Sequence, residues 1–203
     1  MKINFPNAAM VDLACKKFDE DCRIVEETLT DLFARFPANT DIHQVLLKVV
    51  TLNALYSTQI PTYSRTIPNV EDIALHICGN GNEIDAKLTE GSPEVVGKIA
   101  IIVKDKQKRN NYSFATKYCN WHNPQQYPIW DSRIDRYLWL LQKQEHFADR
   151  FTSNSDLWDY SKFRSIMDDF LARCEFSPTS YKRIDKFLWM TGQPDFTSQI
   201  LAD

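Results

Sequence analysis

The chain has 203 residues, of which 43% are hydrophobic and 25% are charged, and its formal net charge is −3. A chain of this size forms one ordinary domain, or at most two small lobes that share a core. The balanced composition excludes a disordered chain, a collagen-like repeat and a small disulfide-stapled scaffold. The slightly acidic balance excludes a protein whose whole surface is basic, but it is compatible with a local basic patch.

The apolar runs and the cysteines indicate the compartment. No apolar run approaches the roughly 20 residues that a membrane span needs, and the segment from Met1 to Pro6 lacks the apolar stretch of a signal peptide. The five cysteines are odd in number and form no Cys-x-x-Cys pair. We therefore expect free thiols in a reducing cytoplasm, with no membrane partner, no metal and no cofactor.

Apolar residues at helical spacing recur along nearly the whole chain, whereas period-two alternation is nowhere sustained. The sequence therefore predicts an all-α protein without a convincing strand. Pro37 ends the first helical region. Asn39 or Thr40 is the expected cap of the second, which is apolar nearly all round and is therefore predicted to be the central buried helix. The expected helical regions, in chain order, are 8–36, 45–55, 70–77, 95–103, 111–122, 130–141, 156–173 and 178–190.

The segment from Lys98 to Arg136 is basic. It contains eight Lys or Arg against three Asp, a local balance of +5, so the rest of the chain carries −8. A basic segment on an acidic protein is typical of a focused contact with phosphate. A solvated run of charge is the alternative explanation.

A polar turn precedes the helix that is expected to begin at Asn111. Because asparagine tolerates left-handed backbone, Asn110 and Asn111 are expected to form a tight turn without glycine. Backbone N–H groups at a helix start bind anions, including phosphate. The sequence therefore favours an anion site at this helix start.

Asp131 stands where the helix after Pro128 is expected to begin. An aspartate at such a position commonly caps its helix. The helix dipole also keeps the carboxylate ionised, and beside a cleft such an anion stabilises a cation that develops on a sugar ring.

The sequence resembles the helix-hairpin-helix DNA glycosylases of base excision repair. Ser113-Phe114-Ala115 stands where that family has Lys or Ser followed by Thr-Ala, and Asp131 follows Ser113 by 18 residues, as in the family. The run from Pro128 to Arg136 is similar to the family motif Pro-x-x-Asp-x-x-Val-x-Arg. The run from Leu55 to Ile60 is similar to the Gln-rich loop that wedges the DNA open. The resemblance covers roughly residues 44–140.

The resemblance implies an all-α fold with a cleft between two lobes. One domain would span residues 1–203, with one lobe formed by residues 44–112 and the other by residues 1–43 plus 113–203. It implies a monofunctional DNA glycosylase in which Asp131 stabilises the oxocarbenium-like sugar and positions water. Ser113 would occupy the place of the family's Lys or Ser. The products would be a free base and an abasic site.

The partner implied is double-stranded DNA, held through its phosphates while one nucleotide is flipped out. Tyr56 or Gln59 would fill the vacated stack. The residues implied in DNA binding are Tyr56, Gln59, Lys106, Lys108, Arg109, Asn110, Asn111, Lys117 and Arg133. Three aromatic residues would stack on the base, although each also suits the core: Tyr118, Trp121 and Trp130.

The chain departs from the family pattern in three places. Arg109-Asn110-Asn111 replaces Gly-x-Gly, position 113 is not a lysine, and the carboxyl-terminal four-cysteine motif of some relatives is missing. We therefore expect no iron–sulfur cluster, and no Schiff-base chemistry unless Lys117 or Lys108 reaches the sugar. Two alternatives stay open: a non-catalytic nucleic-acid-binding module of the same fold, and an all-helical protein-interaction domain. The excised base, and a role in repair or in defence against foreign DNA, are also open.

Overall fold

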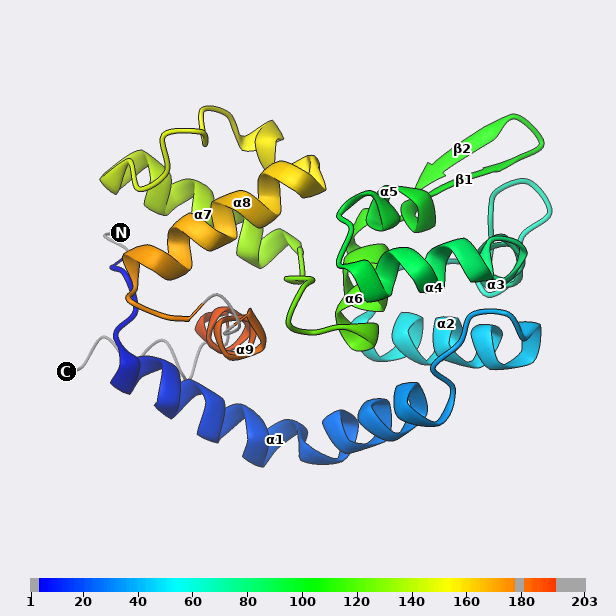
Figure 1. Ribbon diagram of the computed structural model, residues 1–203, viewed down its shortest axis with the longest axis horizontal. Coiled ribbons are helices and arrows are strands. Elements are labelled where there is room, and N and C mark those ends of the chain that lie inside the picture. Colours follow the sequence, from blue (N-terminus) through cyan, green and yellow to red (C-terminus); the bar gives the residue numbers. More distant parts are fainter. Residues whose placement is uncertain (1–3, 178–180, 193–203) are drawn as a thin grey trace. The chain divides into compact units, whose positions relative to one another are not determined.

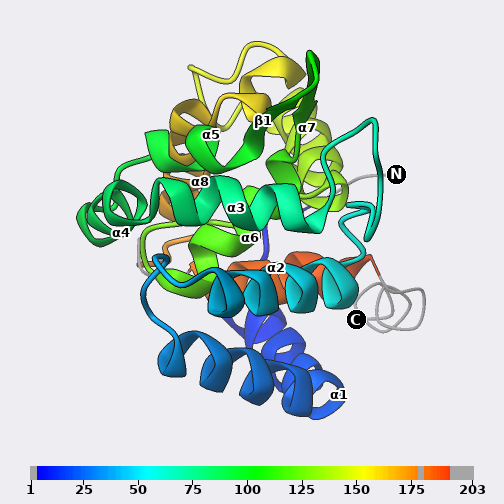
Figure 2. The same ribbon diagram turned by 90° about the vertical axis from the view of Figure 1, so that its right-hand side faces the viewer.

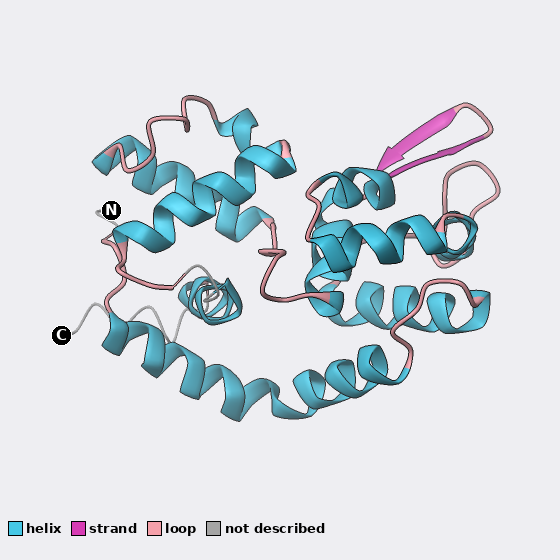
Figure 3. Cartoon of the chain, in the orientation of Figure 1, coloured by secondary structure: helices cyan, strands magenta, loops and turns pink. Residues whose placement is uncertain are grey.

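The computed structural model describes residues 4–177 and 181–192 (Figure 1). Its regular structure is helical apart from one two-stranded sheet (Figure 3), so the prediction of a mostly α-helical protein is confirmed. No helix in these two described ranges is long and apolar enough to cross a membrane. The elements in chain order are α1 (Ala8–Arg35), α2 (Ile42–Tyr56), α3 (Val70–Gly79), α4 (Gly81–Glu90), α5 (Glu94–Ala100), β1 (Ile101–Lys104), β2 (Gln107–Asn110), α6 (Tyr112–His122), α7 (Ser132–Glu145), the 3-10 helix η1 (Asn154–Trp158), α8 (Tyr160–Arg173) and α9 (Tyr181–Thr191).

The chain divides into two compact units. Unit 1 comprises residues 1–26 and 128–203, and unit 2 comprises residues 27–127. The expected lobes divided at residues 43 and 112, whereas the units divide at residues 26 and 127. Helix α6 therefore belongs entirely to unit 2, together with the hairpin that precedes it.

The core of unit 2 forms where α2 packs against α3 and α6, and α5 packs against α6 (Figure 2). The buried residues recur at helical spacing on the facing sides of these helices. Members of this core with no exposed surface are Val49, Leu52, Ile73, Val96, Ile99 and Ala115.

Helix α2 differs from its prediction. Leu47, Val50 and Leu55 are 47%, 41% and 45% exposed, so the helix buries one face rather than its whole circumference. Its N-cap is Asp41, whose side chain accepts hydrogen bonds from two first-turn amides, and not Asn39 or Thr40. Both parts of the prediction are therefore wrong. The helix has more apolar residues than its neighbouring helices cover, so some of them stay exposed.

The two-stranded sheet is an antiparallel hairpin inserted between α5 and α6. The helix expected to reach Val103 ends at Ala100, and the next residues form β1. Asp105 and Lys106 connect the strands, both with positive φ (48° and 67°). Two-residue connections of this kind match the twist of antiparallel strands. The expectation of no strand is therefore wrong at residues 101–110.

Unit 1 is built on α7, α8, α9 and the first part of α1. Phe163, Phe170 and Phe187 are at most 1% exposed and lie in its core. Ion pairs join α9 to α1 within this unit, from Lys182 to Glu26 and from Lys186 to Asp19. These two ion pairs join α9 to α1 at their partly exposed side, and each contributes little to the free energy of unfolding.

Candidate functional site

The start of α6 is an uncapped helix N-terminus beside a buried donor. Asn111 is the N-cap residue of α6, and its amide donates to the Ala100 carbonyl (2.8 Å), but its side chain makes no hydrogen bond to the first turn of the helix. The first-turn amides, such as those of Ser113 and Phe114, therefore receive no capping side chain.

The orientation of the Asn111 side chain is fixed by Arg109. The Arg109 Nε donates to the Asn111 Oδ1 at 2.6 Å, and because a guanidinium only donates, the oxygen of the amide must face it. Asn111 is 7% exposed, and its Nδ2 has no hydrogen-bond partner in the described part of the chain. A buried donor is thus left available at the start of α6.

Lys117 brings a buried cation to the same turn. Its side chain is 4% exposed, and its Nζ lies 2.8 Å from the Ser113 Oγ. The ammonium also lies 5.5 Å from the centre of the Tyr56 ring, whose hydroxyl accepts a hydrogen bond from the Trp121 Nε1 (3.0 Å). The structure therefore brings together four predicted residues of unit 2, namely Ser113, Lys117, Tyr56 and Trp121.

Arg109 links this turn to the segment that follows α2. One of its terminal nitrogens, Nη2, donates to the carbonyl of Gln59 at 2.6 Å. Gln59 has an exposed side chain and a positive φ of 59°. The backbone of Gln59, the Arg109 guanidinium and the Asn111 side chain form a continuous chain of contacts.

The tight Asn-Asn turn predicted before α6 is absent. Asn110 lies in β2, where it pairs with Ile101, and Asn111 has a negative φ of −97°. The reversal is made instead at the hairpin tip, by Asp105 and Lys106. That prediction is wrong because a β-hairpin, and not a short loop, joins the two helices.

Tyr118, expected to stack on a base, is part of the core. It has no exposed surface, and its hydroxyl donates to the Asn39 Oδ1 (2.5 Å). Burial raises the pKa of this phenol well above its usual range. Within unit 2 its ring contacts Phe33 and Phe114, which is the packing role also considered for it.

Sequence reasoning missed a buried polar network around Lys48. This lysine has no exposed surface, and its Nζ donates to the carbonyls of Phe36 (3.1 Å) and Ala38 (3.0 Å) and to the Asn39 Oδ1 (2.7 Å). Burial lowers the pKa of Lys48 to about 8, against the opposing charge of Asp85. The signal in the sequence was a lone lysine between Leu47 and Val49 on an apolar helix.

His122 completes this network. Its Nε2 lies 3.3 Å from the Lys48 Nζ, so the ammonium shares its three N–H groups among four acceptors and the imidazole is neutral. Burial and the adjacent Lys48 charge lower the pKa of His122 to about 3. The network ties the end of α1 to α2 and α6, so its role is structural.

In unit 1, Asp131 is the N-cap of α7, as predicted. Its Oδ1 accepts hydrogen bonds from the amides of Arg133 (2.9 Å) and Ile134 (3.0 Å). Within the described residues no partner contacts its Oδ2, and the residue is half-buried. The carboxylate is therefore held in one orientation with one oxygen available.

Two other predicted residues flank Asp131. The Arg133 guanidinium lies 5.8 Å from the ring of Trp189. Trp130 is 5% exposed and its ring centre lies 4.3 Å from that of Trp158. Trp130 therefore packs in unit 1, and the structure assigns Asp131 and Ser113 to different units.

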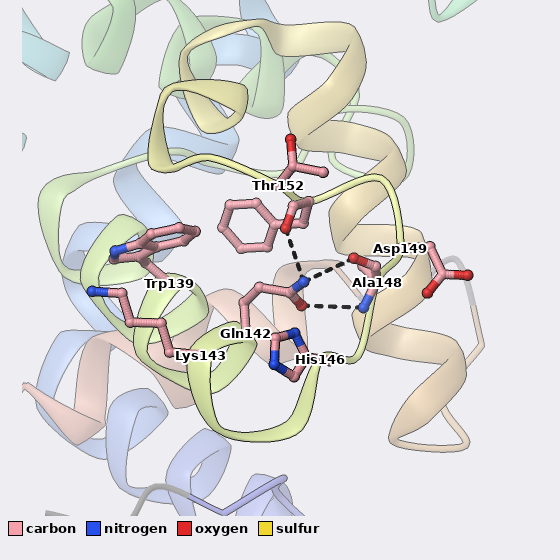
Figure 4. Close-up of a pocket in the computed structure, with 8 residues that line it drawn as sticks. Trp139, Gln142, Lys143, His146, Ala148, Asp149 and Thr152 are labelled. Atoms are coloured by element: carbon pink, nitrogen blue, oxygen red, sulfur yellow. Dashed lines mark hydrogen bonds between the residues drawn. The ribbon is translucent and has the colours of Figure 1, made fainter.

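A pocket of about 270 Å³ lies at the end of α7 (Figure 4). The buried Gln142 lines it, but its amide already bonds to the carbonyls of Ala148 and Phe151 and to the Ala148 amide. The Lys143 Nζ lies 4.9 Å from the centre of the Trp139 ring. The buried amide of this pocket therefore joins α7 to the loop that follows it.

No group of three or more His, Cys, Asp or Glu within residues 4–177 and 181–192 is arranged to hold a metal ion. The cysteines Cys15, Cys22, Cys78, Cys119 and Cys174 are all free thiols.

A protein-family model matches residues 10–126 of the chain; it is named HI_0787_N and described as an N-terminal domain. The chain belongs to this family. It is also similar to an uncharacterized protein of Haemophilus influenzae (strain ATCC 51907 / DSM 11121 / KW20 / Rd), with 31% identity over 158 residues, which cover 78% of this chain and 71% of the relative. No solved structure matches the chain.

The family region and unit 2 end almost together, at residues 126 and 127. The HI_0787_N region thus contains the hairpin, Asn111, Ser113 and Lys117, whereas Asp131 follows it. The descriptions of the family and of the relative state no activity.

Proposed function

We propose that this protein acts in the cytoplasm as a monofunctional DNA glycosylase, which hydrolyses the N-glycosidic bond of a damaged or modified base extruded from duplex DNA. The observation that carries the proposal is the start of α6. Three kinds of group lie close together there: the buried, unbonded Asn111 Nδ2, the uncapped first-turn amides, and the Lys117 ammonium, which reaches back to Ser113.

These groups have the chemistry of a phosphate site. A backbone phosphate accepts hydrogen bonds from helix-start amides, and the helix dipole favours its charge. Such an oxygen would also satisfy the Asn111 donor, which otherwise stays buried at a cost of roughly 1 to 3 kcal/mol. The Lys117 charge beside the Ser113 hydroxyl supplies the countercharge. The site thus favours binding of a polyanion.

Asp131 supplies the candidate catalytic carboxylate. Two backbone amides hold its Oδ1, which leaves Oδ2 for a cationic sugar or for the attacking water. In the proposed step the C1′–N bond breaks and its electron pair leaves with the base. Water then adds its hydroxyl to C1′ and gives one proton to the carboxylate. That proton passes on through solvent to the base anion, so the base is released neutral and the carboxylate is ionised again. The products are a free base and an abasic site.

The non-catalytic nucleic-acid-binding module is the second candidate, and one observation favours it. Ser113 stands where many of the helix-hairpin-helix glycosylases that the sequence resembles have a nucleophilic lysine. Its hydroxyl already accepts a hydrogen bond from the Lys117 Nζ at 2.8 Å. The binding groups at the start of α6 work without Asp131, so DNA binding can persist without base release.

Base release from labelled duplexes tests the proposal. The panel contains uracil, hypoxanthine, 8-oxoguanine, alkylated purines and hydroxymethylated or glucosylated cytosine, and each reaction is divided with and without hot alkali. We expect strand cleavage only after alkali, from at least one substrate. Cleavage without alkali would contradict the monofunctional assignment, and salt-sensitive binding without any release would support the non-catalytic module.

A further inference from the structure

The hairpin formed by β1 and β2 has two different faces. Residues opposite each other in the register share a face, and Val103 pairs with Lys108 while Ile101 pairs with Asn110. Ile101 and Val103 are 41% and 63% exposed, although both are β-branched and apolar. The outer face therefore presents apolar side chains together with Lys108.

The inner face anchors the hairpin to unit 2. Ile102 is 4% exposed, and the Lys104 Nζ pairs with the Asp72 carboxylate at 2.7 Å and bonds to the Ser64 carbonyl at 3.2 Å. Arg109, on the same inner face, bonds to the Gln59 carbonyl and to Asn111. The hairpin is thus held to unit 2 near its tip by Lys104 and nearer its root by Ile102 and Arg109, and is not a loose loop.

The tip of the hairpin extends beyond the helices of unit 2 (Figures 1 and 3). Lys106 and Lys108 are exposed there, and neither ammonium makes a hydrogen bond or ion pair with another described residue. The ten residues 101–110 contain four basic side chains and one acidic side chain, Asp105, on a chain whose net charge is −3. The tip therefore attracts an anionic partner while most of the molecule repels one.

We propose that this hairpin is a wing that enters the major groove of duplex DNA. A two-stranded ribbon fits the roughly 12 Å width of that groove in B-form DNA. Lys106 and Lys108 reach the flanking phosphates, and Val103 lies against base edges such as thymine methyl groups. The deep and narrow major groove of A-form RNA excludes such a ribbon. This inference rests on the DNA-binding part of the proposed function, but not on its catalytic part.

The wing offers DNA contacts that the start of α6 does not offer. The start of α6 offers donors for one phosphate, whereas the hairpin projects and carries its cations at its tip. Arg109 connects the two, because it sits on the inner face of β2 and orients Asn111. Duplex DNA that binds at α6 therefore lies beside the wing.

Fluorescence anisotropy with labelled duplex DNA, duplex RNA and single-stranded DNA tests the wing. The variant Lys106→Ala/Lys108→Ala should bind duplex DNA at least about tenfold more weakly, and its salt slope should fall by about 2. Val103→Ser should weaken binding several-fold with an unchanged salt slope. The matched control, Lys87→Ala/Lys98→Ala, removes two lysines that pair with Glu94 and Glu83 in the same unit. It should change the affinity much less.

Methylation footprinting identifies the groove, because dimethyl sulfate reads guanine N7 in the major groove and adenine N3 in the minor groove. We expect the wild type to protect guanine N7 and the Lys106→Ala/Lys108→Ala variant to lose that protection. Protection of adenine N3 alone, equal affinity for duplex RNA, or an equal loss in the control variant would overturn the wing.

The two proposals fail in different ways. If wing-dependent binding of duplex DNA is found but no substrate releases a base, the wing stands and the glycosylase assignment fails. If base release is found and the wing variants bind and protect DNA like the wild type, the glycosylase stands and the wing fails.

Discussion

Asn111 is a buried residue with a donor that the described chain leaves unbonded. Folded proteins bond nearly all of their buried polar groups, so an exception indicates an ordered water, an external partner or a strained site. The Arg109 contact fixes which end of the amide is oxygen, and the donor therefore cannot be removed by flipping the side chain. We propose that this donor bonds to a phosphate oxygen.

Asn111→Asp exchanges this donor for a charged acceptor of the same shape. We expect the free protein to gain about 1 kcal/mol, because a carboxylate caps α6 and faces Arg109. This corresponds to a rise in Tm of roughly 2 to 4 °C. Affinity for duplex DNA should fall at least about tenfold, since the new charge repels phosphate.

Asn82→Asp is the matched control, because it adds the same charge at an exposed residue of α4 in the same unit, away from the hairpin and the start of α6. Thermal unfolding and DNA titration of both variants give the comparison. A loss of affinity that is equal in the two variants would show that Asn111 has no specific role.

His122 makes stability depend on pH. Its folded pKa of about 3 lies below the ordinary value of 6.5, so the unfolded chain binds the proton more tightly. The stabilisation is complete above pH 6.5 and is lost progressively as pH falls from 6.5 toward 3. His122→Gln should therefore show a shallower loss of unfolding free energy over this range than the wild type.

The measurement is urea unfolding at a series of pH values, with His43→Gln as the control at an exposed histidine. Carboxylates titrate in all three proteins, so the difference between the curves isolates His122. Parallel curves for His122→Gln and the wild type would contradict the assignment of a buried neutral imidazole.

Among the contacts between elements, Lys48 of α2 holds the segment that follows α1. Its ammonium bonds to the carbonyls of Phe36 and Ala38, just after α1. Lys48→Met keeps the apolar stem but leaves these acceptors without their donor. We expect a loss of about 3 kcal/mol in the free energy of unfolding, measured by urea denaturation.

Lys87→Met is the control for this variant, because it breaks a surface ion pair with Glu94. Such pairs contribute less than about 1 kcal/mol. If Lys48→Met unfolded at the same urea concentration as the wild type, the buried network would contribute nothing to the free energy of unfolding.

Helices were predictable where apolar spacing repeats over several turns, as in α1, α7 and α8. Helix α4 lies between the expected helical regions 70–77 and 95–103, because glycines such as Gly79 and Gly81 are typical of a helix end. Gly81 instead allows the start of α4 to lie close to the backbone of Asn39, because a Cβ at this position would overlap the Asn39 carbonyl. Glycine at such a contact looks the same in a sequence as glycine in a turn.

The hairpin was missed for a different reason. Its strands have four residues each, and its turn has neither Asn-Gly nor Asp-Gly but Asp105 and Lys106 in left-handed conformations. Four residues are too few to show period-two alternation. The prediction of an anion site near Asn111 was made from the helix start alone. Helical spacing places Lys117 beside Ser113, four residues earlier, but it does not show that Tyr56 of α2 covers the ammonium.

At the scale of the whole molecule, charge is distributed unevenly along the chain. The segment 98–136 carries +5 and the remainder −8. A polyanion is therefore attracted to one segment and repelled elsewhere, which limits non-specific binding. The two lysines of the wing tip and the α6 site together account for about three phosphate contacts.

Three contacts predict a measurable salt dependence. The slope of log K against log salt should be about −2.7, so that affinity falls roughly forty-fold between ~50 and ~200 mM salt. Anisotropy titrations at several salt concentrations give the slope. A slope near zero would contradict a phosphate-directed interface on either element.

We propose that Asp131 acts chemically and does not only cap α7. Asp131→Asn and Asp41→Asn are matched variants, because each aspartate caps its helix through bonds to amides two and three residues ahead. Asparagine caps equally well, so both variants should fold and bind DNA. We predict that Asp131→Asn abolishes base release in single-turnover assays while Asp41→Asn releases the base like the wild type. Equal base release by both variants would contradict the account.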